Sequence, residues 1–263
     1  MDLGLKGKVA IVAASSRGLG FEIAKAFAEE GVKVSMCARN KSELLKARDT
    51  IIKETGSEVS AFKCDLTVKD EIEQFVKETA ETLGDINILV NNSGGPPTGL
   101  FTELPLEEWM KAVKLNLMST ITLSKTALPY MIKNRWGRII NSTSFSVKQP
   151  IEGLILSNSI RLAVIGFAKT LANEVGKYNI TVNNVCPGYF KTDRVIQLAK
   201  NKAEKLNTVV ENIFKDWESQ IPLGRLGNPR EYAELIVFLA SERASYITGA
   251  TIQIDGGIIK SSL

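Results

Sequence analysis

The sequence contains no histidine, only three cysteines and no long run of apolar residues. Without histidine, the chain cannot build a Ser-His-Asp triad or bind a metal ion through imidazole. Cys37, Cys64 and Cys186 lie far apart in apolar stretches, which predicts reduced core thiols and no metal site. No apolar run reaches the roughly 18 residues of a membrane-spanning helix, so we expect no membrane partner. Proton transfer must therefore use tyrosine, lysine, a carboxyl group, cysteine or water.

The sequence also has little net charge. The 33 basic and 29 acidic side chains give a net charge of +4, spread along the chain, which predicts a mixed solvated surface and no nucleic-acid partner. The first residues run directly into a strand pattern without the features of a signal peptide, so we expect a cytoplasmic protein. No Pro/Gly/Ser-rich stretch divides the chain, which predicts a single domain over residues 1–263.

Strand-like apolar runs alternate with helix-like spacing along the whole chain. The predicted strands are 8–14, 32–38, 58–64, 86–90, 138–144, 180–186 and 251–255. The predicted helices are 18–30, 41–54, 68–83, 106–133, 154–176, 193–217 and 229–241. This alternation predicts an α/β fold, a doubly wound, mostly parallel, seven-stranded Rossmann sheet with helices on both faces. Ligands are then expected at the C-terminal ends of the strands.

The first strand leads into a turn of small residues and then into a helix, with the sequence AASSRGLGFEIAKAF. This arrangement can hold a pyrophosphate through backbone N–H groups and the helix dipole. Gly18 permits close approach of a ligand and Gly20 permits close packing, although a simple tight turn has the same sequence pattern. The residues predicted to contact a cofactor here are Ala14, Ser15, Ser16, Arg17, Gly18 and Leu19.

Six segments together resemble the short-chain dehydrogenase/reductase family. The turn is similar to the family motif TGxxxGxG, with Ala13 and Ala14 replacing the threonine and the first glycine. Alanine at this glycine position is unfavourable wherever the backbone needs a positive φ. The resemblance covers nearly the whole chain, which looks most like the 3-oxoacyl-(acyl carrier protein) reductases and the sugar-dehydrogenase-like members. The other segments are CDL (64–66), NNSGG (91–95), GRIINSTS (137–144), PGYFKTD (187–193) and ITGATIQIDGG (247–257).

The resemblance implies further cofactor contacts. Asp65 and Leu66 are expected at the adenine. Asn91 is expected to hold the cofactor and to brace the sheet. Gly188 and Thr192 belong to the segment that resembles the loop against the nicotinamide.

The end of the second predicted strand indicates which cofactor is bound. Sites specific for NAD place an acidic residue there to bind the ribose 2′-hydroxyl. Here Ala38 and Arg39 occupy this place, and no acidic residue precedes Glu43. A guanidinium can bind a 2′-phosphate through two hydrogen bonds, and Arg17 is a second candidate for this contact. Unless both arginines are ordinary solvated side chains, we expect NADP(H) in preference to NAD(H).

The segments expected to carry the chemistry depart from the family. Family members transfer hydride between nicotinamide and a carbonyl carbon, and use an asparagine, a serine, a tyrosine and a lysine. Asn116 and Ser144 match the first two. SNSIRLAVIGFAKTLANEV (157–175) resembles YSASKAGVIGFTKTLA, which places Ser157 at the tyrosine position and Arg161 at the lysine position. The resemblance assigns all four residues to catalysis, and Arg161 also to the cofactor ribose.

The replacements change the chemistry that is available. A serine hydroxyl is far less acidic than a phenol and arginine stays protonated, so Ser157 and Arg161 cannot act as the family's acid and its pKa-tuning partner. Loss of a general acid costs about 10²–10⁴ in rate. Arg161 can still stabilise an alkoxide, and Ser157 can order a water. Tyr189 is a candidate replacement acid unless it only packs or lines the substrate, and Ser144 has the alternative of being a satisfied strand-end hydroxyl.

These features predict an atypical NADP(H)-dependent oxidoreductase that acts on a small carbonyl or alcohol substrate by a modified proton path. Two alternatives stay open: an NADP(H)-binding sensor or pseudoenzyme without turnover, and a fold reused for a non-redox step such as dehydration. Residues 189–225 are interpreted as a lid over an apolar or extended substrate, or as a helical segment that packs on the body or on a neighbouring subunit. The resemblance also implies a homotetramer joined through the two long helices and the C-terminal strand.

Overall fold

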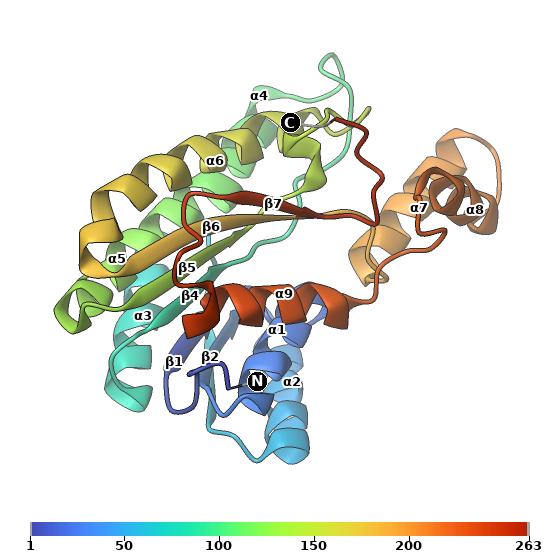
Figure 1. The fold of residues 1–263 in the computed structure, drawn as a ribbon. Helices are drawn as coiled ribbons and strands as arrows, with labels where there is room; N and C mark the ends of the chain where they lie inside the picture. The colour runs from blue at the N-terminus through green and yellow to red at the C-terminus, as the bar shows by residue number, and fades with distance from the viewer. Residues whose placement is uncertain (1, 262–263) are drawn as a thin grey trace.

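The computed structural model describes residues 2–261, and its centre is a sheet of seven parallel strands (Figure 1). The strand order is β3-β2-β1-β4-β5-β6-β7, and every neighbouring pair is parallel. The predicted doubly wound Rossmann sheet is therefore confirmed. The strands are β1 (Val9–Val12), β2 (Lys33–Ala38), β3 (Val59–Lys63), β4 (Ile88–Asn91), β5 (Gly137–Ser142), β6 (Ile180–Pro187) and β7 (Thr251–Ile254).

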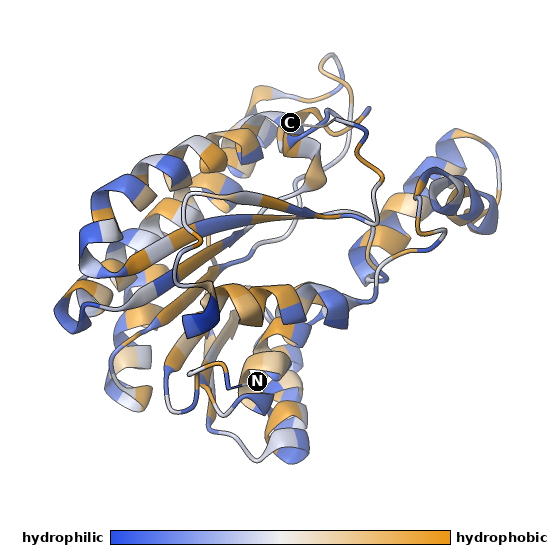
Figure 2. Cartoon of the chain, viewed as in Figure 1, coloured by the Kyte–Doolittle hydropathy of each residue, from blue (hydrophilic) through white to orange (hydrophobic). Residues whose placement is uncertain are grey.

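Helices cover both faces of the sheet (Figure 1). One face carries α1 (Gly18–Glu29), α2 (Lys41–Thr55) and α9 (Pro229–Ala240), and the other carries α3 (Lys69–Leu83), α5 (Ser119–Asn134) and α6 (Ile155–Val175). Each face has its own buried core, built around Phe27 and Tyr232 on one side and Phe75 and Met131 on the other. The strands are largely apolar because both of their faces are covered (Figure 2).

Local signals begin and end the helices as the sequence suggests. Asn40 caps α2 by accepting hydrogen bonds from the N–H groups of Ser42 and Glu43, and Gly56 ends this helix in a left-handed conformation. Asn228 caps α9 in a reciprocal capping box with Glu231. Such caps satisfy backbone groups that a helix end leaves without partners.

Two of the predicted helices differ from the structure. The segment expected as one helix over 106–133 consists of α4 (Leu106–Ala112), a π-helical turn η1 (Val113–Met118) and α5. The segment expected as one helix over 193–217 forms α7 (Asp193–Lys205) and α8 (Val210–Gln220), because the chain turns at Asn207 with a φ of +50°. Both α7 and α8 project from the body beyond the sheet (Figure 1).

One helix among residues 2–261 is long and apolar enough to cross a membrane, which the sequence analysis did not predict. This stretch is α6 with its continuation to Tyr178. Within the structure, Leu156, Val164 and Leu171 are buried. A core helix passes the same test of length and composition, so the stretch is weak evidence for a membrane span.

Candidate active site

The turn between β1 and α1 presents free backbone N–H groups. Arg17 is the N-cap of α1, and its side chain makes no capping hydrogen bond. Within the described part of the chain, the N–H groups of residues 16–20 donate no hydrogen bond. Together with the dipole of α1, these groups can bind an anion. This is the geometry expected of a pyrophosphate site.

The same turn is held by Asn92, which the sequence analysis did not single out. Its Nδ2 donates to the carbonyl oxygens of Ala13 and Ala14 at 3.1 and 3.2 Å. A Cβ on Gly20 would lie 2.8 Å from this Nδ2, so glycine is needed there for close packing. Ser15 is buried, and its hydroxyl donates to the carbonyl of Val12 at 2.8 Å. The adjacent asparagines in the family-like segment drew attention to Asn91, and no sequence signal separates the two.

Ala14 has a φ of +48°, in the left-handed region that favours glycine. The family motif has glycine at this position, and here an alanine adopts the conformation that glycine adopts without steric penalty. The conformation costs alanine about 1–2 kcal/mol. The departure from the motif therefore places backbone strain at the turn before α1.

The ends of β2 and β3 bring together the residues expected at the adenosine half of a cofactor. Arg17 and Arg39 are both exposed, and neither forms an ion pair with any residue in 2–261. Asp65 is half-buried, and its Oδ1 accepts from the N–H and the hydroxyl of Thr67. Leu66 is buried. Two cationic side chains without a carboxylate partner fit an anionic group at this corner.

Asn91 begins a row of amides that crosses the sheet. Its Nδ2 donates to Asn141 Oδ1 at 2.8 Å and to Ser124 Oγ at 3.0 Å. Asn141 Nδ2 donates to Asn184 Oδ1 at 2.9 Å, and Asn184 Nδ2 donates to Thr251 Oγ1 at 3.2 Å. The row thus links β4, β5, β6 and β7. Asn91 Oδ1 is buried without a partner in the described chain.

Asn116 lies in the π-helical turn η1 and is buried. Its Nδ2 donates to Ser93 Oγ at 2.8 Å and to the carbonyl oxygen of Gly94 at 2.9 Å. The amide therefore holds the loop after β4, and its buried Oδ1 has no partner within residues 2–261. Single π-helical turns inside α-helices occur frequently at functional sites.

The predicted catalytic serines are linked by a third serine. Ser144 caps the short helix η2 (Phe145–Val147), and its Oγ accepts from the N–H of Ser146 at 3.1 Å. Ser146 Oγ lies 3.2 Å from Ser157 Oγ, and both side chains are buried. No hydrogen bond within the described residues joins Ser144 to Ser157 directly. Ser146 was missed by sequence reasoning, because nothing in the motif distinguishes it from a turn residue.

Arg161 is buried on α6, with 8% of its surface exposed. Its Nη1 donates to the carbonyl oxygen of Ser142 at 3.0 Å, whereas its Nε and Nη2 have no partner within residues 2–261. Burial lowers the pKa of Arg161 to about 10. From the other face of the sheet, Tyr232 donates to Ser142 Oγ at 2.8 Å, and burial raises the pKa of this phenol. Tyr232 thus reaches this strand end from behind the sheet.

The loop after β6 meets the phosphate-binding turn. A Cβ on Gly18 would lie 3.7 Å from Thr192 Cγ2, so Thr192 lies beside the start of α1. A Cβ on Gly188 would lie 2.7 Å from Asp255 Cα, so glycine is needed for the loop to pass the end of β7. The structure therefore brings the predicted residues of the β1 and β6 loops together.

Tyr189 belongs to an aromatic cluster. Its ring stacks on Trp217 at a centroid distance of 4.3 Å and meets Phe145 edge-on at 5.2 Å. Burial, and to a lesser extent the charge of Asp216, raises the pKa of Tyr189 to about 12. A phenol held between rings with a raised pKa is a poor acid, which favours the packing interpretation.

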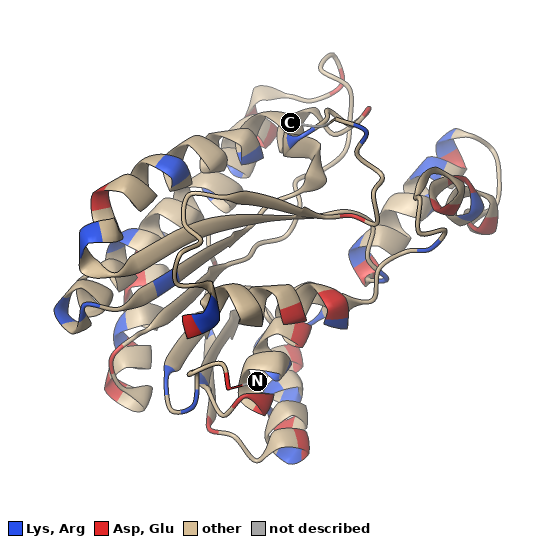
Figure 3. Ribbon diagram, viewed as in Figure 1, with Lys and Arg blue, Asp and Glu red and all other residues tan. Residues whose placement is uncertain are grey.

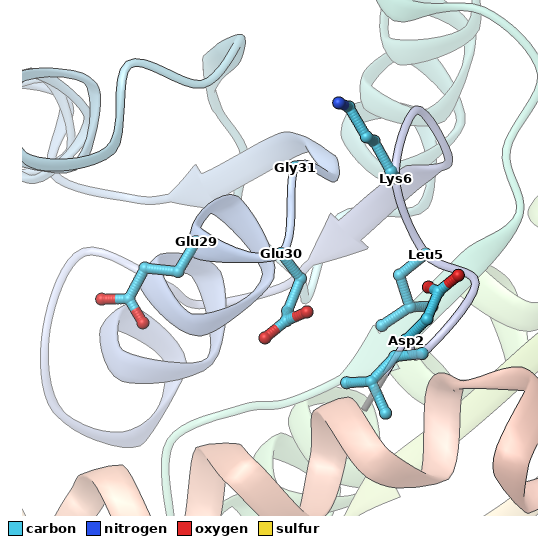
Figure 4. Close-up of a pocket in the computed structure, with 7 residues that line it drawn as sticks. Asp2, Leu5, Lys6, Glu29, Glu30 and Gly31 are labelled. Carbon is cyan, nitrogen blue, oxygen red and sulfur yellow. The ribbon is translucent and has the colours of Figure 1, made fainter.

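A hollow elsewhere on the surface does not belong to this site. Figure 4 shows it between the N-terminal segment, which carries Asp2, Leu5 and Lys6, and the end of α1, which carries Glu29 and Glu30. These segments precede β1 and β2, so the hollow lies at the opposite edge of the sheet from the turn before α1. Ligands of doubly wound sheets bind at the C-terminal ends of the strands, so we assign no function to the hollow.

The comparisons with known proteins agree with this geometry. A family model described as enoyl-(acyl carrier protein) reductase matches residues 13–259. The chain is 34% identical over 258 residues to 3-oxoacyl-(acyl carrier protein) reductase FabG of Aquifex aeolicus (strain VF5), covering 98% of this chain and 100% of that protein.

Solved structures give the same result. L-Sorbose reductase from Gluconobacter frateurii, complexed with NADPH and L-sorbose, has a TM-score of 0.94 and 32% identity, covering 99% of this chain and 100% of that one. A variant of actinorhodin polyketide ketoreductase with NADPH has a TM-score of 0.93 and 31% identity, covering 97% and 98%. The chain therefore belongs to the short-chain dehydrogenase/reductase family of oxidoreductases.

Proposed function

We propose that the protein is an NADP(H)-dependent reductase of small carbonyl compounds that works without the family's tyrosine and lysine. The observation that carries this proposal is the position of Arg161. Its buried guanidinium lies at the end of β5 and has two nitrogen atoms, Nε and Nη2, without partners in the described chain. Such a group can stabilise the negative charge that develops on a carbonyl oxygen.

The residues present fit NADP(H). The free N–H groups of residues 16–20 suit the pyrophosphate, and Arg17 and Arg39 suit the 2′-phosphate. Asp65 and Leu66 suit the adenine. The NADPH found in the two structural relatives supports the same choice. When bound, NADPH supplies the hydride. The assignment of Ala14, Ser15, Ser16, Gly18, Leu19, Asn91, Gly188 and Thr192 to this cofactor stays a prediction.

The proton path is assigned to serines and water. Ser144 Oγ already accepts a hydrogen bond from the N–H of Ser146, so its own proton is free for donation to a carbonyl oxygen. Ser157 and Ser146 form a hydroxyl pair that can hold a water molecule as the proton source. Asn116 holds the loop after β4 in place. Arg161 stabilises the alkoxide and binds the ribose.

Turnover distinguishes this proposal from a sensor. We expect the purified protein to oxidise NADPH in the presence of a panel of ketones and aldehydes, and Arg161→Met to abolish this activity. Arg48→Gln, on the outer surface of α2, serves as the control because Arg48 pairs only with the neighbouring Asp49. Tight NADPH binding without oxidation above the protein-free rate, for every carbonyl tested, would establish the sensor instead. The missing side-chain acid at Ser157 is the observation that keeps this second candidate open.

Cofactor preference has a separate test. We expect fluorescence titration to give NADPH a dissociation constant at least about tenfold lower than that of NADH, because a charge-assisted contact to the 2′-phosphate contributes roughly 1.5–3 kcal/mol. Arg39→Asp should remove or reverse the preference, since a carboxylate repels the 2′-phosphate. Equal affinities in the unmodified protein would contradict the assignment.

The domain organisation, the lid, the assembly and the location complete the proposal. We retain a single domain over residues 1–263 with α7 and α8, within 189–225, as a lid. The lid interpretation is supported by the position of these helices beyond the C-terminal ends of the strands (Figure 1). A homotetramer and a cytoplasmic location also stay predictions.

A further inference from the structure

Ser142 is the last residue of β5, and two helices reach it from opposite faces of the sheet. From α6, Arg161 Nη1 donates to the carbonyl oxygen of Ser142 at 3.0 Å. From α9, the hydroxyl of Tyr232 donates to Ser142 Oγ at 2.8 Å. The two helices cover different faces of the sheet (Figure 1). Ser142 therefore connects a tyrosine on one side of the sheet to the arginine of the proposed site on the other.

The three connected side chains are withdrawn from solvent. Tyr232 is fully buried, and Ser142 and Arg161 are each 8% exposed. Most charged side chains of the described chain lie instead on the outer surfaces of helices and in loops (Figure 3). Within residues 2–261, the bond to Ser142 is the only hydrogen bond of the Arg161 guanidinium. The carbonyl of Ser142 is thus the polar contact that orients this buried cation.

Ser142 needs an anchor because the sheet pairing ends beside it. The register between β4 and β5 ends one residue before Ser142. On the side of β6, the N–H of Thr143 donates to the carbonyl oxygen of Val185 at 2.8 Å. The hydroxyl of Tyr232 supplies a second attachment, from the side of α9. Strand ends with few backbone partners open more easily than strand centres, so this attachment limits the movement of the carbonyl that Arg161 contacts.

The ring of Tyr232 has a contact separate from that of its hydroxyl. The ring meets Phe190 edge-on at a centroid distance of 5.5 Å, and Phe190 is a buried residue of the loop after β6. A phenylalanine at position 232 would keep this packing and lose only the hydroxyl. Burial raises the pKa of Tyr232, so its hydroxyl keeps its proton and stays a donor up to strongly basic pH. The hydrogen bond to Ser142 can therefore be removed without removing the ring.

We propose that Tyr232 is a positioning residue, whose hydroxyl holds the end of β5 so that Ser142 directs Arg161 towards the cofactor and the carbonyl substrate. This inference rests on the proposed role of Arg161 and adds a residue from behind the sheet. Groups that contact a ligand are held in place by the hydrogen bonds of the residues behind them. Tyr232 acts through Ser142 and Arg161 and needs no contact with substrate or cofactor.

Two variants separate positioning from stability. Tyr232→Phe leaves the buried Ser142 Oγ without a donor, so we expect a lower Tm and weaker NADPH binding. Tyr232→Phe combined with Ser142→Ala leaves no unpaired hydroxyl, so the Tm should return towards that of the unmodified protein. NADPH binding should stay about threefold to tenfold weaker in this double variant, because the attachment of the strand end is still missing. Tyr246→Phe, at a fully exposed tyrosine, is the control and should change neither quantity.

A thermodynamic cycle with Arg161→Met tests whether Tyr232 acts through the arginine. Fluorescence titration gives the NADPH dissociation constant of the unmodified protein, of each single variant and of the two combined. We expect Tyr232→Phe to weaken NADPH binding about threefold to tenfold when Arg161 is present. When position 161 is methionine, the same change should have less than about a twofold effect.

Three results would overturn the proposal. One is an equal effect of Tyr232→Phe with and without Arg161, since Tyr232 would then act on the fold alone. Another is NADPH binding that recovers together with the Tm when Ser142→Ala is added. The third is NADPH binding that Tyr232→Phe leaves unchanged.

A kinetic measurement separates this inference from the proposed function. With a ketone that the protein reduces, and with rates counted per NADPH-binding site, Tyr232→Phe should lower kcat about threefold to tenfold. The KM for the ketone should change by less than about twofold, because Arg161 stabilises charge that develops only during the reaction. The expected NADPH cycle without reduction of any carbonyl would end the reductase proposal and leave the positioning role standing. Turnover that requires Arg161, with kcat and NADPH binding unchanged in Tyr232→Phe, would do the reverse.

Discussion

Ala14 holds a left-handed backbone at the turn before α1, where a glycine would have no steric penalty. We expect Ala14→Gly to raise the free energy of unfolding by about 1 kcal/mol, because the relief of strain exceeds the added entropy of the unfolded glycine. Urea denaturation measures the change. The matched control is Ala163→Gly on the exposed side of α6, which should lower stability by about 0.5–1 kcal/mol. A destabilised Ala14→Gly protein would contradict the strain.

We expect Arg161 to favour catalysis and to lower the free energy of unfolding. Because burial lowers its pKa to about 10, the charged form is less favourable in the folded chain than in the unfolded one. With a folded pKa below the unfolded one, this destabilisation is fully present below pH 10 and decreases only above it. We therefore expect Arg161→Met to raise the free energy of unfolding at pH 7 by about 1–3 kcal/mol. Thermal denaturation checks the sign, and Arg48→Met, at a half-buried arginine that is paired with Asp49, is the control.

Tyr189 is expected to have no part in proton transfer. Since its pKa is raised to about 12, the phenol stays neutral up to strongly basic pH, and its ring is held between Trp217 and Phe145. We expect Tyr189→Phe to change kcat by less than about twofold between pH 6 and 9, far below the loss from a removed general acid. A loss of about 10² or more would make Tyr189 the acid.

Single residues of the site could be predicted from the sequence, but the hydrogen bonds between them could not. The positions of Ser144, Ser157 and Arg161 came from a motif register, and the structure places all three around the end of β5 and the start of α6. The hydroxyl contact through Ser146 could not be predicted, since it depends on how η2 folds back on α6. The contacts of Asn92 could not be predicted either, because its partners are backbone carbonyl groups, which every residue has.

Among the elements, α7 and α8 form a unit of their own. Val195, Ala199, Ile213 and Trp217 are buried together in a cluster separate from the two cores of the sheet. Trp217 is 5% exposed and stacks on Tyr189, which follows β6. A segment with its own small core can open without unfolding the sheet.

We expect Trp217→Ala to loosen α7 and α8 and to leave the sheet intact. Truncation of a buried tryptophan typically costs about 3–5 kcal/mol, and here the loss falls on a small cluster. Hydrogen exchange should therefore become faster across Asp193–Gln220 and stay unchanged in β4–β6. Trp109→Ala, on α4, is the matched tryptophan control. Faster exchange throughout the sheet would show that α7 and α8 are not an independent unit.

The predicted boundaries of most helices and strands agree with the structure to within a few residues. The two errors have physical causes. The break at Asn207 involves neither glycine nor proline, so apolar spacing continued across it. The π-helical turn around Asn116 shifts the helix phase without changing composition. Periodicity detects an element but not a local change of hydrogen-bonding pattern within it.

For the whole molecule, the absence of histidine predicts a flat response to pH. No side chain type in this chain has an ordinary pKa between about 5 and 8, so the side-chain charge changes little between about pH 6 and 8. We expect the Tm to vary by less than about 3 °C between pH 5.5 and 8, which corresponds to roughly 1 kcal/mol. Scanning calorimetry in pH steps measures this, and a step near pH 6.5 would contradict it.

Below about pH 5.5, the free energy of unfolding should fall as carboxyl groups with lowered pKa values become protonated. Hydrogen bonds from Arg225 lower the pKa of Glu231 to about 2, and Lys133 lowers the pKa of Asp85. A carboxyl group with a lowered folded pKa adds stability above its unfolded pKa and loses it as the pH falls towards the folded value. Both pairs are largely exposed, so the loss between about pH 4.5 and 2 is expected to be small for each.

The overall fold could be predicted because the alternation of strand and helix patterns is repeated along the whole chain. Seven apolar runs alternating with helices leave few topologies for a parallel sheet, and right-handed crossovers reduce these further. The convergence of Arg161 and Tyr232 on Ser142 from opposite faces of the sheet could not be predicted, since α6 and α9 are far apart in the sequence.

The amide row across β4–β7 has a direction. Each amide donates towards the next strand along the row, from Asn91 to Asn141, then Asn184 and finally Thr251. Turning a single amide around would set two donors or two acceptors face to face, so the row can reverse only as a whole. Its polarity leaves one acceptor unused at the beginning of the row, the Oδ1 of Asn91, at the strand end next to the proposed cofactor site. The row therefore has a fixed polarity, and its first residue offers an open hydrogen-bond acceptor beside the proposed cofactor site.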